Sequence, residues 1–172
     1  MQKITHQQLL DWLKKEVKLS LGCTEPIAIA YAAAVAAKYL NAPILKITGN
    51  ISENLYKNAM GVTIPGTSYC GVTLAAAIGA IGGNADADLE VLKDITATQI
   101  TEAYIFNESG NVCLNAVDAT DFIFIDITLY SLSDQCRVVI QGSHTNVTEV
   151  YINNIKQILV RDLIAANDSG VL

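Results

Sequence analysis

The chain has 172 residues and a formal net charge of −6, and 51% of its residues are hydrophobic while 16% are charged. A sequence this apolar is expected to fold rather than stay disordered, and its length suits a single domain. The basic residues form no run or stripe. We therefore expect no nucleic-acid partner and no attraction to an anionic membrane surface.

Membrane insertion and secretion are also not expected. The longest uncharged apolar stretch, residues 27–37, is about half of the roughly 20 residues that a transmembrane helix needs. The N-terminal "MQKITHQQLLDW" lacks the apolar segment of a signal peptide. The four cysteines are widely spaced and form no C-x-x-C pair. These features predict a cytoplasmic protein with reduced thiols.

The first half of the chain predicts helices. Residues 5–18 place apolar side chains at helical spacing and predict an amphipathic helix. A second helix is expected to begin near Glu25–Pro26, because proline suits a first helical turn, and to end near residues 41–43. Residues 44–50 alternate like a short strand. Further helices are predicted at residues 52–61, 72–83 and 88–108.

Small residues recur at every fourth position of the helix predicted at 72–83. Gly71, Ala75, Gly79 and Gly83 form a smooth stripe that lets another backbone approach closely. We expect it to pack against the small side chains of the second helix, namely Ala28, Ala32 and Ala36.

After Gly110 the pattern changes to a period of two with many β-branched residues, which predicts an antiparallel meander of three or four strands. The expected fold class is α+β, with an Ala/Gly-rich helical part at 1–109, a β part at 110–160 and a tail at 161–172. Because no Pro/Gly/Ser-rich linker divides these parts, we expect one α+β unit over residues 1–172.

Cys23 directly precedes the second helix. The positive end of a helix stabilises a thiolate, which can act as a nucleophile or as a metal ligand. A free cysteine is, however, commonly a small buried apolar side chain. Glu25 has an equally simple interpretation as a first-turn acid that interacts with the helix dipole. Position alone leaves these alternatives open.

Two polar stretches are further candidates for chemistry. Lys57 is a possible general base or ion-pair partner, and His144 in "GSHTN" follows an apolar strand, where an imidazole can accept a proton or bind a substrate. A solvated lysine and a turn histidine are the alternatives. A loop just before a helix is expected to offer N–H and hydroxyl groups to a carboxylate through Gly66, Thr67 and Ser68.

Four stretches occur in an order that resembles the L-cysteine desulfidase family, which is related to the alpha chain of iron–sulfur L-serine dehydratases. They are "LGCTEPIAIAYAAA", "ENLYKNAMGVTIPGT", "GVTLAAAIGAIGG" and "GSHTNV". The resemblance runs over residues 21–153. It implies a [4Fe–4S] lyase that eliminates sulfide from L-cysteine to give pyruvate and ammonia, or water from L-serine, and it leaves the choice of substrate open.

The same resemblance implies site residues. Cys23 would be a cluster ligand, and Lys57 or His144 would be the catalytic base. The implied substrate-binding residues are Asn54, Asn58, Gly66, Thr67, Ser68, Thr145 and Asn146.

Members of that family are longer and carry further cluster cysteines in a C-terminal half. The resemblance therefore implies that this chain is the N-terminal part of an enzyme, inactive and without a cluster until joined by that half or a partner chain. Apolar surface exposed without that half would favour a homo-oligomer. The alternative is a non-catalytic small-molecule-binding or assembly module derived from the same family.

Overall fold

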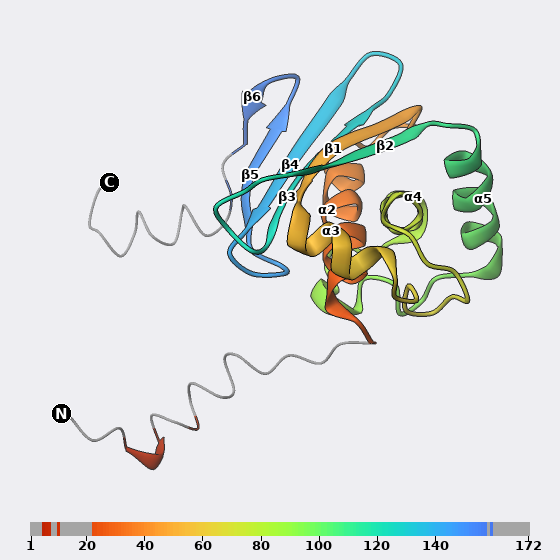
Figure 1. The fold of residues 1–172 in the computed structure, drawn as a ribbon. Helices are drawn as coiled ribbons and strands as arrows, with labels where there is room; N and C mark the ends of the chain where they lie inside the picture. Colours follow the sequence, from red (N-terminus) through yellow and green to blue (C-terminus); the bar gives the residue numbers. More distant parts are fainter. Residues whose placement is uncertain (1–4, 8–9, 11–21, 158, 160–172) are drawn as a thin grey trace.

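A six-stranded sheet with helices on one face forms the body of the protein (Figure 1). The computed structural model of the chain describes residues 5–7, 10, 22–157 and 159. The predicted α+β fold class is confirmed within these residues. The helix predicted over 5–18 lies mostly outside them, and the tail predicted over 161–172 lies entirely outside them.

The elements follow the predicted order closely. The helices are α2 (Thr24–Leu40), α3 (Glu53–Met60), α4 (Val72–Gly82), the short 3₁₀ helix η1 (Asp88–Glu90) and α5 (Ala97–Glu108). The strands are β1 (Lys46–Ser52), β2 (Val112–Val117), β3 (Phe124–Tyr130), β4 (Gln135–Gln141), β5 (Val147–Ile152) and β6 (Ile155–Lys156).

The strand order is β2-β1-β3-β4-β5-β6. Strands β3 to β6 form the predicted antiparallel meander. Strand β2 had been expected to belong to this meander. Instead it pairs in parallel with β1, with Val112 opposite Ile47. Parallel strands need a long crossover connection, and α3, α4 and α5 supply it here. The period-two pattern of β2 is the same for either orientation, so the sequence pattern did not distinguish them.

Helix α2 forms the centre of the core. It packs against β3 and β4 on one side and against α4 on another, and the residues from Pro26 to Ala36 are buried without interruption. A helix that is covered on several sides must be apolar all round, which explains its alanine-rich sequence. Helix α4 lies between α2 and α5 (Figure 1).

The contact between α2 and α4 depends on Gly79. A Cβ atom built on Gly79 would lie 2.1 Å from the carbonyl oxygen of Ala30, and one built on Gly83 would lie 2.9 Å from the Cβ of Ala34. The predicted helix pairing is therefore present. It is centred on Ala30 and Ala34 rather than on the predicted alanine set, because in a helix with alanine on every side the sequence does not show which side faces the partner.

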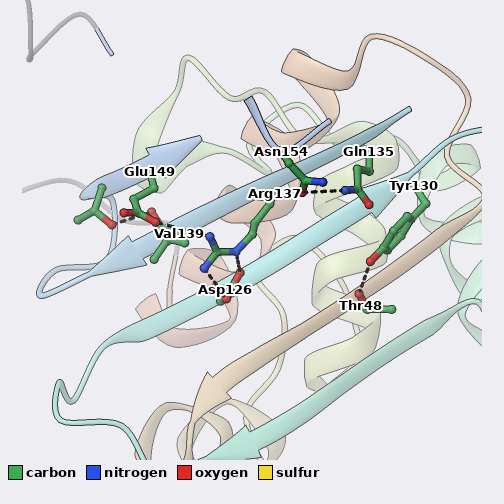
Figure 2. A network of polar contacts seen from close by, with 9 residues as sticks. Thr48, Asp126, Tyr130, Gln135, Arg137, Val139, Glu149 and Asn154 are labelled. Carbon is green, nitrogen blue, oxygen red and sulfur yellow. Dashed lines mark hydrogen bonds and ion pairs between the residues drawn. The ribbon is translucent and has the colours of Figure 1, made fainter. Parts of the chain in front are cut away.

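The opposite face of the sheet carries polar side chains (Figure 2). Arg137 donates two hydrogen bonds to the carboxylate of Asp126, at 2.8 and 2.9 Å, and its guanidinium lies 5.4 Å from the ring centroid of Tyr151. Thr48 donates to the hydroxyl of Tyr130 at 3.5 Å. Antiparallel sheets commonly leave one such face solvated, so this ion pair has a sufficient structural explanation.

Among the described helices, none combines the length and the apolar character needed to cross a membrane.

Candidate functional site

At the N-terminus of α2, a thiol and a carboxylate are hydrogen-bonded to each other. Cys23 is the N-cap residue, with φ −64° and ψ 126°, and its thiol donates a hydrogen bond to Oε2 of Glu25 at 2.9 Å. The hydroxyl of Thr24 also approaches this oxygen, at 3.4 Å. Both Cys23 and Glu25 are half-buried. The side chains at this end of the helix therefore bond to each other instead of capping the backbone.

The protonation of Cys23 corrects a prediction made from the helix dipole. Burial raises the pKa of the Cys23 thiol, and the hydrogen bond to Glu25 and its negative charge raise it further. The hydrogen bond from Cys23 in turn lowers the pKa of Glu25. The thiolate expected at the positive helix end is thus disfavoured, because burial and a carboxylate two residues away both oppose a negative charge on the sulfur.

His144 lies near this pair, in the turn between β4 and β5. Both of these strands contact α2. Burial lowers the pKa of His144, while the negative charge of Glu25 acts in the opposite direction. The Nε2 atom of His144 is buried and makes no hydrogen bond within the described part of the chain. A neutral imidazole with an unused ring nitrogen is suited to proton transfer.

The predicted loop at Pro65–Gly66–Thr67 comes close to the same helix end. A Cβ atom built on Gly22 would lie 3.1 Å from Cγ of Pro65. Within the loop, the N–H of Thr67 donates to the carbonyl of Ile64 at 3.1 Å, and its hydroxyl donates to the same carbonyl at 2.9 Å. These two groups of Thr67 therefore close the loop, instead of standing open for a substrate carboxylate.

The loop also borders an open pocket of ≈ 400 Å³ on the side of α5. Neither Cys23 nor His144 lines this pocket, so the predicted carboxylate-binding residues and the thiol occupy different surroundings. The pocket is lined by Gly66, Thr67, Ser68, Tyr69, Ala97, Ile100 and Thr101.

The remaining predicted residues are on the surface or in the His144 turn. Lys57 is exposed on α3, and its Nζ lies 2.8 Å from Oε2 of Glu53 on the same helix. Asn54 and Asn58 are also exposed there. In the turn, Thr145 is half-buried, and the exposed Asn146 donates through Nδ2 to the carbonyl of Gln141 at 2.9 Å.

Two predicted residues, Cys23 and His144, thus both interact with a third residue, which the sequence had assigned only to the helix dipole. That third residue is Glu25, which hydrogen-bonds to one and interacts electrostatically with the other. A C-x-E sequence at a helix start was the available signal. It was not sufficient by itself, because an acid is common in a first turn.

The implied iron–sulfur cluster does not fit the described residues. Such clusters are held by several cysteine thiolates, whereas the thiol of Cys23 donates a hydrogen bond to the carboxylate of Glu25. Cys70 and Cys113 are exposed, and Cys136 is buried in β4, where burial raises its pKa to about 12. No group of three or more His, Cys, Asp or Glu side chains in the described ranges is placed to hold a metal ion.

Replacing Glu25 with glutamine is expected to lower the pKa of Cys23. The negative charge of Glu25 and its hydrogen bond both favour the protonated thiol, and the change removes the charge and alters the hydrogen bond. Alkylation of Cys23 by iodoacetamide should then reach half its maximal rate at a lower pH. The measurement uses a Cys70→Ser, Cys113→Ser background, so that exposed thiols do not contribute. Glu53→Gln is the matched control and should leave the profile in place, whereas an unchanged profile in Glu25→Gln would contradict the coupling.

Fold and site together define an α+β protein with a coupled thiol, carboxylate and imidazole at one helix end. In sequence, the chain is similar to UPF0597 proteins. It is 54% identical to one from Klebsiella pneumoniae over 86% of this chain and 35% of that protein. The identity is 44% to one from Photobacterium profundum, over 85% and 34%, and 45% to one from Shewanella sediminis, over 86% and 35%.

The chain spans about a third of the length of these relatives. Their names state no activity, substrate or cofactor. No family model matches the chain, and no solved structure matches it.

These relatives overturn the family resemblance inferred from the four motifs. Proteins at 44–54% identity over most of the chain are UPF0597 proteins, not L-cysteine desulfidases or serine dehydratases. Two of the four motifs consist largely of Ala/Gly-rich helix, and the structure shows that this composition follows from the close packing of α2 on α4. An Ala/Gly-rich composition is therefore weak evidence for membership of a particular family.

Proposed function

We propose that this chain is the N-terminal part of a lyase that eliminates the β-substituent of a small amino acid, either sulfide from L-cysteine or water from L-serine. The observation that supports the proposal is the grouping of Cys23, Glu25 and His144 at one end of a rigid buried helix. Pairs of titratable groups whose surroundings move their pKa values apart are typical of acid–base sites.

Each group has a role in this proposal. β-Elimination needs a base for the α-proton and a proton for the leaving group. His144 would take the α-proton, since burial favours its neutral form. The protonated Cys23 thiol would donate to the departing sulfide or hydroxide, and Glu25 would hold that thiol in place. The aminoacrylate that remains would hydrolyse to pyruvate and ammonia. Lys57 is a weaker candidate for the base, because it is exposed and paired with Glu53.

A [4Fe–4S] cluster belongs to this proposal only for the complete protein. It would need several thiolates, supplied by a C-terminal half or a partner chain, because Cys23 acts here as the proton donor. The roles given above to the residues of this chain do not depend on the cluster. We propose that the chain alone binds no cluster and is inactive, and that the reaction takes place in the cytoplasm, where thiols stay reduced.

The test compares this chain with the complete protein, in which the chain continues into the remaining length typical of its relatives. Both are purified without oxygen and supplied with iron and sulfide, and sulfide and pyruvate are measured from L-cysteine and from L-serine. The proposal requires pyruvate from one of these substrates with the complete protein, none with the chain alone, and a large loss in Cys23→Ser. The exposed Cys113 provides the control Cys113→Ser, which should keep full activity.

A non-catalytic small-molecule-binding or assembly module is the second candidate. One observation favours it, namely that Thr67 uses its N–H and hydroxyl groups in internal hydrogen bonds of its loop. Absence of pyruvate from both substrates, together with equal behaviour of the complete protein and its Cys23→Ser variant, would support this candidate and contradict the lyase.

A further inference from the structure

Helix α5 has large apolar side chains on the side that faces away from the core. It packs on α4, the central helix of the row α2–α4–α5 (Figure 1), and Ala103 is its one buried residue. The side chain of Ile105 is 60% exposed and that of Tyr104 is 40% exposed. A helix that is apolar on more than one side is normally covered on more than one side.

A second element extends this apolar surface. Tyr69, from the loop before α4, lies against Tyr104 with ring centroids 5.4 Å apart and is itself 42% exposed. Tyr69 also lines the ≈ 400 Å³ pocket, together with Ile100 and Thr101 of α5, which lie one turn before Tyr104 on that helix. Exposed tyrosines beside a pocket are characteristic of the centre of a protein–protein interface.

The charged side chains of α5 itself have a single sign. Helix α5 contains Glu102 and Glu108 and has no lysine or arginine. A partner that covers the apolar centre would therefore be favoured by basic side chains at its edge.

We infer that this surface, made by Tyr69, Ile100, Thr101, Tyr104 and Ile105, is the docking surface for the remainder of the complete protein. Each relative has about two thirds of its length outside the region that matches this chain. That additional polypeptide is joined covalently to the matched region, so it is present at high effective concentration. The segment that docks is expected to be apolar with lysine or arginine at its edge. The inference does not depend on the proposed reaction.

The experiment measures how fast a cysteine on this surface reacts with a maleimide. Ile105→Cys is placed in the 172-residue chain and in the complete protein, and labelling of its peptide is followed by mass spectrometry. Leu132→Cys is the matched control, because Leu132 is an apolar residue in the turn between β3 and β4 and is 93% exposed. Both positions lie outside the core, so the fold should tolerate either change.

Docking predicts that the thiol introduced by Ile105→Cys reacts more slowly in the complete protein than in the chain alone, by roughly tenfold or more, since the covered surface must first open. The Leu132→Cys site should react equally fast in both. Equal rates for Ile105→Cys in the two proteins would overturn the inference. It would also be overturned by protection that appears in the chain alone and increases with its concentration, because a second copy would then be the occupant. The rates require no turnover, so they remain informative if the lyase proposal fails.

Discussion

Replacing Gly79 with alanine is expected to lower the free energy of unfolding by about 3 kcal/mol, the upper part of the range for overpacked cores. The new Cβ atom would lie 2.1 Å from the carbonyl oxygen of Ala30 and 2.5 Å from its Cα. These are backbone atoms of the most buried helix, so no side-chain rotation relieves the clash, and α2 and α4 must separate. A loss of this size should lower the melting temperature by about 6–12 °C.

Gly61 offers a matched control for this change. It ends α3 with φ −97°, and a Cβ atom built there has no neighbour within 4 Å. The free energy of unfolding of Gly61→Ala should therefore lie within about 0.5 kcal/mol of that of the unsubstituted chain, as for most surface substitutions. Urea unfolding followed by circular dichroism compares the two variants. Equal midpoints for Gly79→Ala and Gly61→Ala would disprove the close contact between α2 and α4.

The second large effect is expected on the proposed lyase reaction. In the complete protein, His144→Gln should lower kcat by roughly 10²–10⁴-fold, the usual contribution of a general base, with a smaller change in KM. The control is His6→Gln, which changes the other histidine of the chain, an exposed residue. Pyruvate formation at several substrate concentrations separates the two constants. A loss expressed only in KM would assign His144 to substrate binding instead.

The direction of the pKa shift of His144 also predicts a pH dependence. The proposed base must be neutral to accept a proton, so kcat/KM should be highest above the pKa of His144 and should fall as the pH falls through it. Burial lowers this pKa from the ordinary 6.5, which places the acid limb below pH 6.5. Removing the charge of Glu25 should move the limb to still lower pH, because that charge favours the protonated imidazole. An acid limb above pH 6.5 would contradict the assignment.

Much of the fold was predictable because the periodicity is clear. The alternation in β3 to β5, the proline in the first turn of α2 and the glycine-containing stripe of α4 indicated the correct elements. The orientation of β2 was not predictable, since parallel and antiparallel edge strands share the same pattern. The side of α2 that packs against Gly79 was likewise not predictable from the sequence, because α2 has alanine on every side.

The arrangement of the candidate site was predicted only in part. Cys23 and His144 stood out by residue type and position, whereas the raised pKa of Cys23 depends on its burial and on a 2.9 Å hydrogen bond, neither of which a sequence shows. Glu25 was overlooked as a partner for the same reason. Lys57 was selected for its polar surroundings, but its ion pair with Glu53 is an ordinary i,i+4 pair on an exposed helix.

The most direct test of a single coupled site at Cys23, Glu25 and His144 is the pKa of His144, measured by NMR in the chain and in its Glu25→Gln variant. With two histidines in the sequence, the two resonances are assigned by His6→Gln. The negative charge of Glu25 raises the pKa of His144 against the effect of burial, so the pKa should fall further in Glu25→Gln. The same pKa in both proteins would show that Glu25 and His144 do not interact, and the proposed site would not exist.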